Sequence, residues 1–152
     1  MYLLNSAVIS DTSTTKLYRL GERRYTLDRT YGTREWIYVQ MKGGAIAVGE
    51  GVMQENGTDL FQVGKHAVTT PNARMVGVAA HAIAENSFGW VLKDGRGYCA
   101  SDGTTTADTI QATAASGRFT DGTAVTSENG VWALETESPA GAGGLFLALI
   151  HF

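Results

Sequence analysis

The side chains able to bind metal ions or act as nucleophiles are few and widely spaced in this sequence. Histidines stand at His66, His81 and His151, and the single cysteine is Cys99. No pair of them has the spacing of a zinc site, such as two histidines four residues apart on a helix. Cys99 follows Tyr98 in a segment typical of a strand, where a cysteine is most often a small core residue. The sequence therefore predicts neither a metal site nor thiol catalysis.

Phosphate, calcium and serine-hydrolase chemistry have no better support. The glycine-rich loop Pro139–Gly144 precedes a strand and lacks lysine, whereas phosphate-binding loops open a helix. The segment Asp102–Asp108 lacks the alternating ligands and terminal Glu of a helix-loop-helix calcium site. There is no Gly-x-Ser-x-Gly elbow. We therefore expect no catalytic residue, no cofactor and no small-molecule substrate, and we expect that the chain is not an enzyme.

Length and charge narrow the classes of partner. The 152 residues suit one domain, and the net charge of −3 lacks the basic excess that binding to nucleic acid requires. Residues 1–42 are the exception, because they hold seven of the twelve Lys and Arg and carry a net charge of +3. The longest apolar run, Leu145–Ile150, is far shorter than the ~20 residues of a membrane helix. We expect no nucleic-acid or membrane partner and, without an evident signal peptide, synthesis in the cytoplasm.

Glycine-containing turns are the strongest structural signal. Five dipeptides have the composition of type I′ hairpin turns: Asn56-Gly57, Asp94-Gly95, Asp102-Gly103, Asp121-Gly122 and Asn129-Gly130. Short segments rich in aromatic and β-branched residues lie between them. The segment Asp108–Ala115 fits either a short helix or a strand. The expected fold is all-β: a compact β-sandwich or barrel-like domain of short strands joined by Asn-Gly and Asp-Gly hairpins, with an extended N-terminal arm.

The expected strands are the segments 36–41, 45–48, 75–79, 88–92, 98–100, 131–134 and 145–151. Within them we assign Trp90, Val91 and Trp132 to the core. The last strand is apolar on both faces, which suits a strand covered on one side by a neighbouring subunit. We therefore predict a homotrimer whose interface includes one face of this strand, either Leu145, Leu147 and Leu149 or their opposite-face partners Phe146 and Ile150.

The N-terminal part differs from the rest in composition. We divide the chain into residues 1–35, a basic arm or leading strands of the same domain, and residues 36–152, the β-domain. Exposed arginines and tyrosines would suit contact with an acidic protein surface. The candidate contact residues are Arg19, Arg23, Arg24, Tyr25, Arg29, Tyr31 and Arg34.

Three motifs carry a resemblance to a known family. A Gly-Val-Ala-Ala strand at residues 77–80 leads through a polar turn to Gly89-Trp90-Val91, the segment Ala45–Glu50 ends in a Gly-Glu turn, and Gly143-Gly144 precedes the last apolar strand. This pattern, over roughly residues 36–152, resembles the small tailed-bacteriophage capsid decoration (cement) proteins. The resemblance implies an all-β homotrimer on the outer capsid surface of the virion. Its partner would be the major capsid protein, whose neighbouring capsomers it would bridge and stabilise.

A second interpretation is a receptor-binding or fibre-type β-module from the same kind of virus. In that case Trp36, Trp90 and Trp132, or the tyrosines, would form a sugar-binding face. Copy number in the particle separates the two interpretations, because decoration proteins are abundant and fibres are few.

Overall fold

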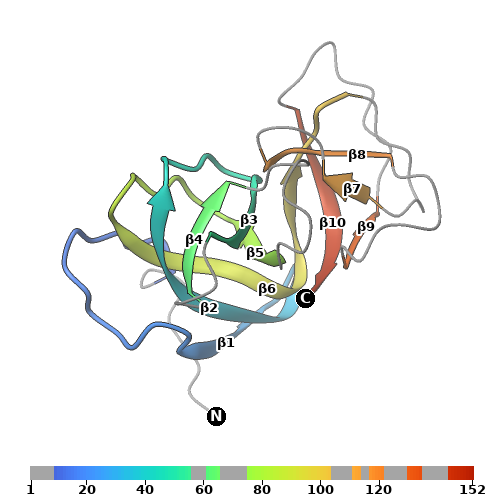
Figure 1. Ribbon diagram of the computed structural model, residues 1–152. Helices are drawn as coiled ribbons and strands as arrows, with labels where there is room; N and C mark the ends of the chain where they lie inside the picture. Colours follow the sequence, from blue (N-terminus) through green and yellow to red (C-terminus); the bar gives the residue numbers. More distant parts are fainter. Residues whose placement is uncertain are drawn as a thin grey trace.

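The computed structural model describes residues 9–55, 61–65, 75–103, 111–113, 117–121, 130–134 and 144–152. Within these ranges every regular element is a strand, so the all-β prediction is confirmed (Figure 1). The strands are β1 (Arg23–Asp28), β2 (Gly32–Gly43), β3 (Gly51–Gln54), β4 (Gln62–Lys65), β5 (Met75–Ala79), β6 (Phe88–Ala100), β7 (Gln111–Thr113), β8 (Phe119–Asp121), β9 (Val131–Ala133) and β10 (Leu145–His151). In Figure 1, β1 to β6 form the body, and β7 to β10 form a smaller lobe beside it.

Five strands of the body close into a barrel. Their order is β2-β4-β3-β5-β6, and β6 pairs with β2 to complete the ring. The β2–β4 pair is parallel and the other four pairs are antiparallel. Closure leaves no free edge among these strands. Each strand contributes apolar side chains to one buried cluster, which includes Ile37, Val39, Met41, Val52, Val63, Ala79 and Val91.

The segment expected as a basic arm is partly a β-hairpin. β1 pairs antiparallel with the first half of β2, from Arg23 opposite Ile37 to Asp28 opposite Gly32. The turn forms because the Asp28 carboxylate accepts the backbone N–H groups of Thr30 and Tyr31, at 2.7 and 3.1 Å. Of the two interpretations of residues 1–35, the structure places residues 23–35 in leading strands of the domain, and a free arm over these residues is wrong.

Aromatic side chains on the outer face of the barrel form a second core. Tyr38 on β2 and Trp90 on β6 lie opposite each other with ring centroids 5.0 Å apart. Tyr18, from the irregular segment 9–22, packs against both, at 5.2 and 5.4 Å. Trp36 is buried on the same face, and its indole N–H donates to the Thr26 hydroxyl at 2.9 Å. The segment 9–22 thus covers the outer face of β2 and β6.

The long strand β6 joins the barrel to the smaller lobe. Its first half pairs with β2 and β5, and its second half pairs with β10. The halves meet at Asp94-Gly95, so the prediction of a hairpin turn there is wrong. Gly95 has φ of +111°, and a Cβ atom at this position would lie 2.8 Å from the Thr33 carbonyl oxygen. Glycine here permits a bend within the strand rather than a reversal of the chain.

In the smaller lobe β10 lies between β6 and β9, and β7 pairs with β8. The strand interpretation of residues 111–113, within the ambiguous segment Asp108–Ala115, is the correct one. Of the other expected turns, Asp102-Gly103 follows β6, Asp121 ends β8 and Gly130 precedes β9. The dipeptide Asn56-Gly57, His66 and most of the loop Pro139–Gly144 lie outside the described residues.

Trp90 and Val91 occupy the core positions expected from the sequence, each with an exposed fraction of 0%. Replacing Trp90 with alanine removes an aromatic ring from the contact with Tyr18 and Tyr38. We expect Trp90→Ala to lower the free energy of unfolding by about 3–5 kcal/mol. Denaturant unfolding measures this loss. The control Leu27→Ala removes a side chain that is 71% exposed and should change stability by no more than about 0.5 kcal/mol. Equal midpoints for the two variants would contradict the assignment.

Candidate functional site

The last strand presents a row of leucines to solvent. Along β10 the side chains alternate, so that Phe146 and Ile150 are fully buried while Leu145 and Leu149 are 40% and 44% exposed. Leu147 lies on the same side as the exposed leucines and is partly buried. The expected interface residues therefore divide between two faces. Phe146 and Ile150 belong to the core of the subunit, so the alternative that places them in the subunit interface is wrong, and the alternative with the three leucines stays a prediction.

The neighbouring strands extend this row into a continuous surface. Leu149 lies between Trp132 on β9 and Arg96 on β6, and Leu147 lies opposite Tyr98. Tyr98 is 44% exposed and Arg96 is exposed. We call this surface the β9–β10–β6 face, and its members are Arg96, Tyr98, Trp132, Leu145, Leu147 and Leu149.

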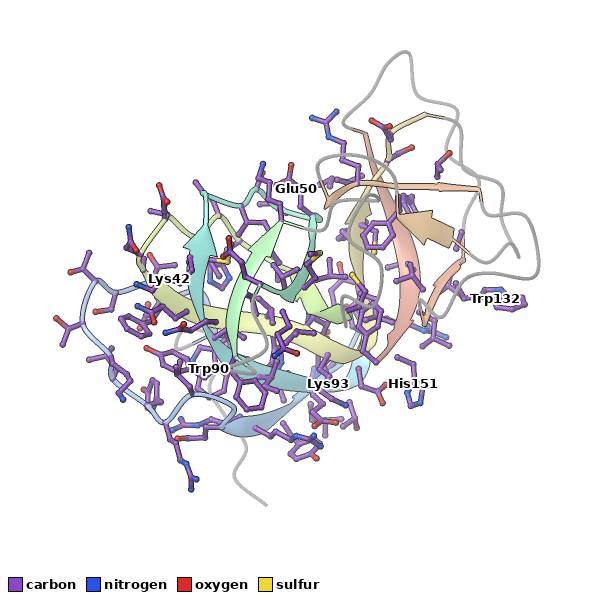
Figure 2. All side chains as sticks on the ribbon, in the orientation of Figure 1. Lys42, Glu50, Trp90, Lys93, Trp132 and His151 are labelled. Carbon is purple, nitrogen blue, oxygen red and sulfur yellow. The ribbon has the colours of Figure 1, made fainter. Side chains whose placement is uncertain are left out.

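Trp132 was expected in the core, and this prediction is wrong. It is 42% exposed, because Val131 and Ala133 take the inward positions of the three-residue strand β9. Figure 2 shows the indole projecting away from the ribbon of the smaller lobe. A large exposed apolar group beside the exposed Leu149 is typical of a surface that contacts another protein.

A hollow of about 140 Å³ borders this face. Tyr98 belongs to both, and its ring meets the ring of Tyr31 edge to face, with centroids 6.2 Å apart. Val48, which is 39% exposed, comes from the loop before β3. We call this cavity the tyrosine hollow. Its lining residues are Tyr31, Arg34, Val48, Val78, Ala80, Leu92, Gly97 and Tyr98.

A buried ion pair holds the loop that carries Val48. The Glu50 side chain is 5% exposed, and its carboxylate lies 3.0 Å from the Lys65 ammonium (Figure 2 labels Glu50). The same carboxylate accepts the backbone N–H of Ala47 at 2.8 Å. Because removal of one partner would leave a buried charge, this pair fixes the position of the loop beside the hollow.

Two of the five candidate contact arginines are held within the protein. The Arg24 guanidinium lies 2.6 Å from the Glu22 carboxylate, 4.2 Å from the centroid of the Tyr18 ring and 5.1 Å from that of Trp90. The Arg34 guanidinium lies 3.5 Å from Asp28 and about 5 Å from the ring centroids of Tyr31 and Trp36. These contacts are structural, and they stabilise the hairpin on the barrel.

The other candidate contact residues remain on the surface. Arg19 and Arg29 are exposed, and Arg23 has an exposed fraction of 55% although it pairs with Glu35 at 3.3 Å. Tyr25 and Tyr31 are partly buried. Of the five candidate contact arginines, Arg19, Arg23 and Arg29 are therefore available to a partner.

The Cys99 side chain lies in the interior of the protein. Burial raises the pKa of the Cys99 thiol well above its ordinary value, and its exposed fraction is 0%. Within the described ranges, no group of three or more His, Cys, Asp or Glu side chains is placed to hold a metal ion. The same ranges contain no helix that is long and apolar enough to span a membrane.

Sequence reasoning missed the tyrosine hollow and the exposure of Trp132. Tyr31 and Tyr98 are 67 positions apart in the sequence, so no local pattern predicts their contact. The alternation Arg96-Gly97-Tyr98-Cys99 carried a usable signal, since it places Arg96 and Tyr98 on one side of the strand and Cys99 on the other.

Comparison with known proteins gives a likeness of fold. No protein-family model matches the chain, and no curated protein matches it in sequence. The fold is similar to that of the N base of head fiber gp8.5 in bacteriophage phi29, with a TM-score of 0.54. The two chains share 16% sequence identity, and the match covers 76% of this chain and 92% of that one. At this identity the likeness is one of fold.

His81 makes the stability of the barrel sensitive to pH. It is partly buried, and its Nε2 atom has no hydrogen-bond partner among the described residues. Burial lowers its pKa, an effect that Asp11 opposes. Since the unfolded chain has a histidine pKa near 6.5, it takes up the proton first as the pH falls. We therefore expect the free energy of unfolding to decrease below about pH 6.5.

Thermal unfolding measured across this pH range tests the effect. His81→Gln should remove part of the pH dependence, whereas the exposed His151→Gln should retain the contribution of His81. The same slope in the wild type and in His81→Gln would contradict the assignment to His81.

Proposed function

We propose that this chain is a structural protein of a bacteriophage particle. In this proposal it lies on the outer surface of the capsid, where copies associate as a trimer, bind the major capsid protein and bridge neighbouring capsomers. The observation that carries the proposal is the exposed β9–β10–β6 face, on a fold similar to the base of a phage head fiber. The sequence resemblance to capsid decoration proteins supports the same class of role.

The apolar face supports association between copies. Trp132, Leu145, Leu149 and Tyr98 are each 40–44% exposed. Full burial of a large apolar side chain contributes about 1.5–3 kcal/mol, so burial of the remaining exposed part contributes on the order of 1 kcal/mol each. Several such residues in a row make a plausible core for a protein interface, in which aromatic residues are enriched.

The exposed arginines support a contact with an acidic partner surface. Arg19, Arg23 and Arg29 belong to residues 1–42, which carry a net charge of +3 in a chain of net charge −3. Single exposed ion pairs contribute only ~0.2–1 kcal/mol. In a trimer each arginine is present three times, and the simultaneous contacts reinforce one another.

The chain acts in this proposal by binding alone. It has no enzymatic activity, no cofactor, no small-molecule substrate, and no nucleic-acid or membrane partner. The inaccessibility of Cys99 supports this view, because a buried thiol of raised pKa is a poor nucleophile.

A second candidate function is a fibre-type module. The name of the similar structure favours a role as the base that anchors a head fiber. A sugar-binding face built from all three tryptophans has no support, because Trp36 and Trp90 are 2% and 0% exposed. Trp132 would be the one tryptophan available to such a face.

The position of the chain in purified particles tests the proposal. Particles of the phage whose genome encodes the chain would be labelled with antibodies against it and imaged. We expect label over the whole head and a copy number that scales with that of the major capsid protein. A few copies at one site would favour the fibre base, and absence from the particles would overturn a role in the virion.

Binding to particles stripped of the chain tests the arginines. We expect Arg19, Arg23 and Arg29, when changed together to glutamine, to lower occupancy several-fold in 0.1 M salt. The difference should shrink near 1 M salt, since the Debye length falls from ~10 Å to ~3 Å. The control Lys42→Gln removes an exposed cation near the C-terminal end of β2 (Figure 2). Equal occupancy for the triple variant and the control at every salt concentration would show that these arginines do not make the contact.

A further inference from the structure

The tyrosine hollow has the size and lining of a socket for one side chain. Its volume of about 140 Å³ is well below the ~300–1,000 Å³ of small-molecule sites. Val48, Val78 and Leu92 make its wall apolar. Two lining side chains, Val48 and Tyr98, are also exposed at the surface. An apolar group of modest size would exchange water for these contacts.

The rings in the lining favour an aromatic occupant. The Arg34 guanidinium pairs with Asp28 at 3.5 Å and lies about 5 Å from the ring centroids of Tyr31 and Trp36, so its charge is already partnered. The rings of Tyr31 and Tyr98 meet edge to face at the hollow, and aromatic rings favour such edge-to-face and offset contacts with one another. An indole therefore matches the hollow through its apolar wall and its two tyrosine rings.

The same chain exposes an indole on the face that borders the hollow. Trp132 is 42% exposed on β9, and the register places it beside Leu149 and in the row that ends at Arg96. Among the described residues, no other aromatic ring and no guanidinium packs against the Trp132 ring. The indole and the hollow lie at opposite borders of the face, on β9 and β6, so one copy cannot fill its own hollow.

We infer that the tyrosine hollow receives the Trp132 side chain of a second copy of this chain. In the trimer the hollow of each copy takes the indole of the next, and the leucines of β10 pack around this contact. The inference rests on the self-association in the proposed function, and it adds the contact that sets how the copies are oriented.

Two variants separate the two halves of the contact. Trp132→Ala removes the indole and keeps the hollow, and Ala80→Phe fills the hollow and keeps the indole. Ala80 is exposed, so the larger side chain has room to fold against the lining. The matched control Ala82→Phe adds the same ring at an exposed position outside the hollow.

Sedimentation velocity of the full-length proteins, alone and mixed, is the test. We expect each variant alone to raise the dissociation constant about tenfold or more, since buried tryptophans are frequent interface hot spots. Ala82→Phe should associate as the wild type does. An equimolar mixture of the two variants should form a 1:1 complex, because the indole of one still fits the hollow of the other.

The outcomes are distinct. Variants that associate like the wild type, or a mixture that behaves as the separate variants do, would overturn the inference and leave the proposed self-association intact. A wild-type protein that is monomeric at every concentration would overturn both. Thermal unfolding of each variant shows whether a loss of association reflects a loss of folding.

Discussion

Strand β6 pairs with barrel strands along its first half and with β10 along its second half, and the rest of the structure depends on the bend between the halves. Its first half pairs with β2 and closes the barrel, and its second half pairs antiparallel with β10. The bend requires Gly95, whose φ is +111° and whose missing Cβ would lie 2.8 Å from the Thr33 carbonyl oxygen. A side chain here would displace the β1–β2 hairpin or the second half of β6. In either case Tyr98 would move away from Tyr31, and both the hollow and the face beside it would change.

The two faces of β10 have different roles. The inner side, with Phe146 and Ile150 fully buried, stabilises the smaller lobe, and the outer side leaves Leu145 and Leu149 partly exposed. Exposure of large apolar side chains in a row does not stabilise a monomer, and it favours association. The arginines likewise divide into side chains packed within the subunit and side chains exposed on its surface. Arg24 is held against the aromatic core of the subunit, whereas Arg19 and Arg29 remain on the surface. In the proposed function, the exposed leucines contact other subunits and the exposed arginines contact the capsid.

The sequence predicted β2, β5, β6, β9 and β10 because their aromatic and β-branched residues are local signals. The short strands β3 and β4 were not expected, and the expected strand 45–48 forms only an isolated bridge at Ile46. The sequence did not predict barrel closure, since β2 and β6 meet only after long-range pairing. Asp94-Gly95 has the composition of a hairpin turn, yet tertiary pairing on both sides keeps it within β6. From Leu145 to Ile150 every position of β10 is apolar, so the pattern could not tell Leu149 from Ile150. Trp132 was assigned to the core by residue type alone, although Val131 and Ala133 fill the inward positions of β9.

The central claim is that the β9–β10–β6 face is an interface between copies, and Trp132 offers a direct measurement of it. Trp36 and Trp90 are buried, so iodide quenching of tryptophan fluorescence reports chiefly on Trp132, which is 42% exposed. Quenching and molecular mass would be measured together over a dilution series. The account predicts that protection of Trp132 from iodide increases in parallel with the mass. An increase in mass with Trp132 still open to iodide, or a constant monomer mass, would contradict it.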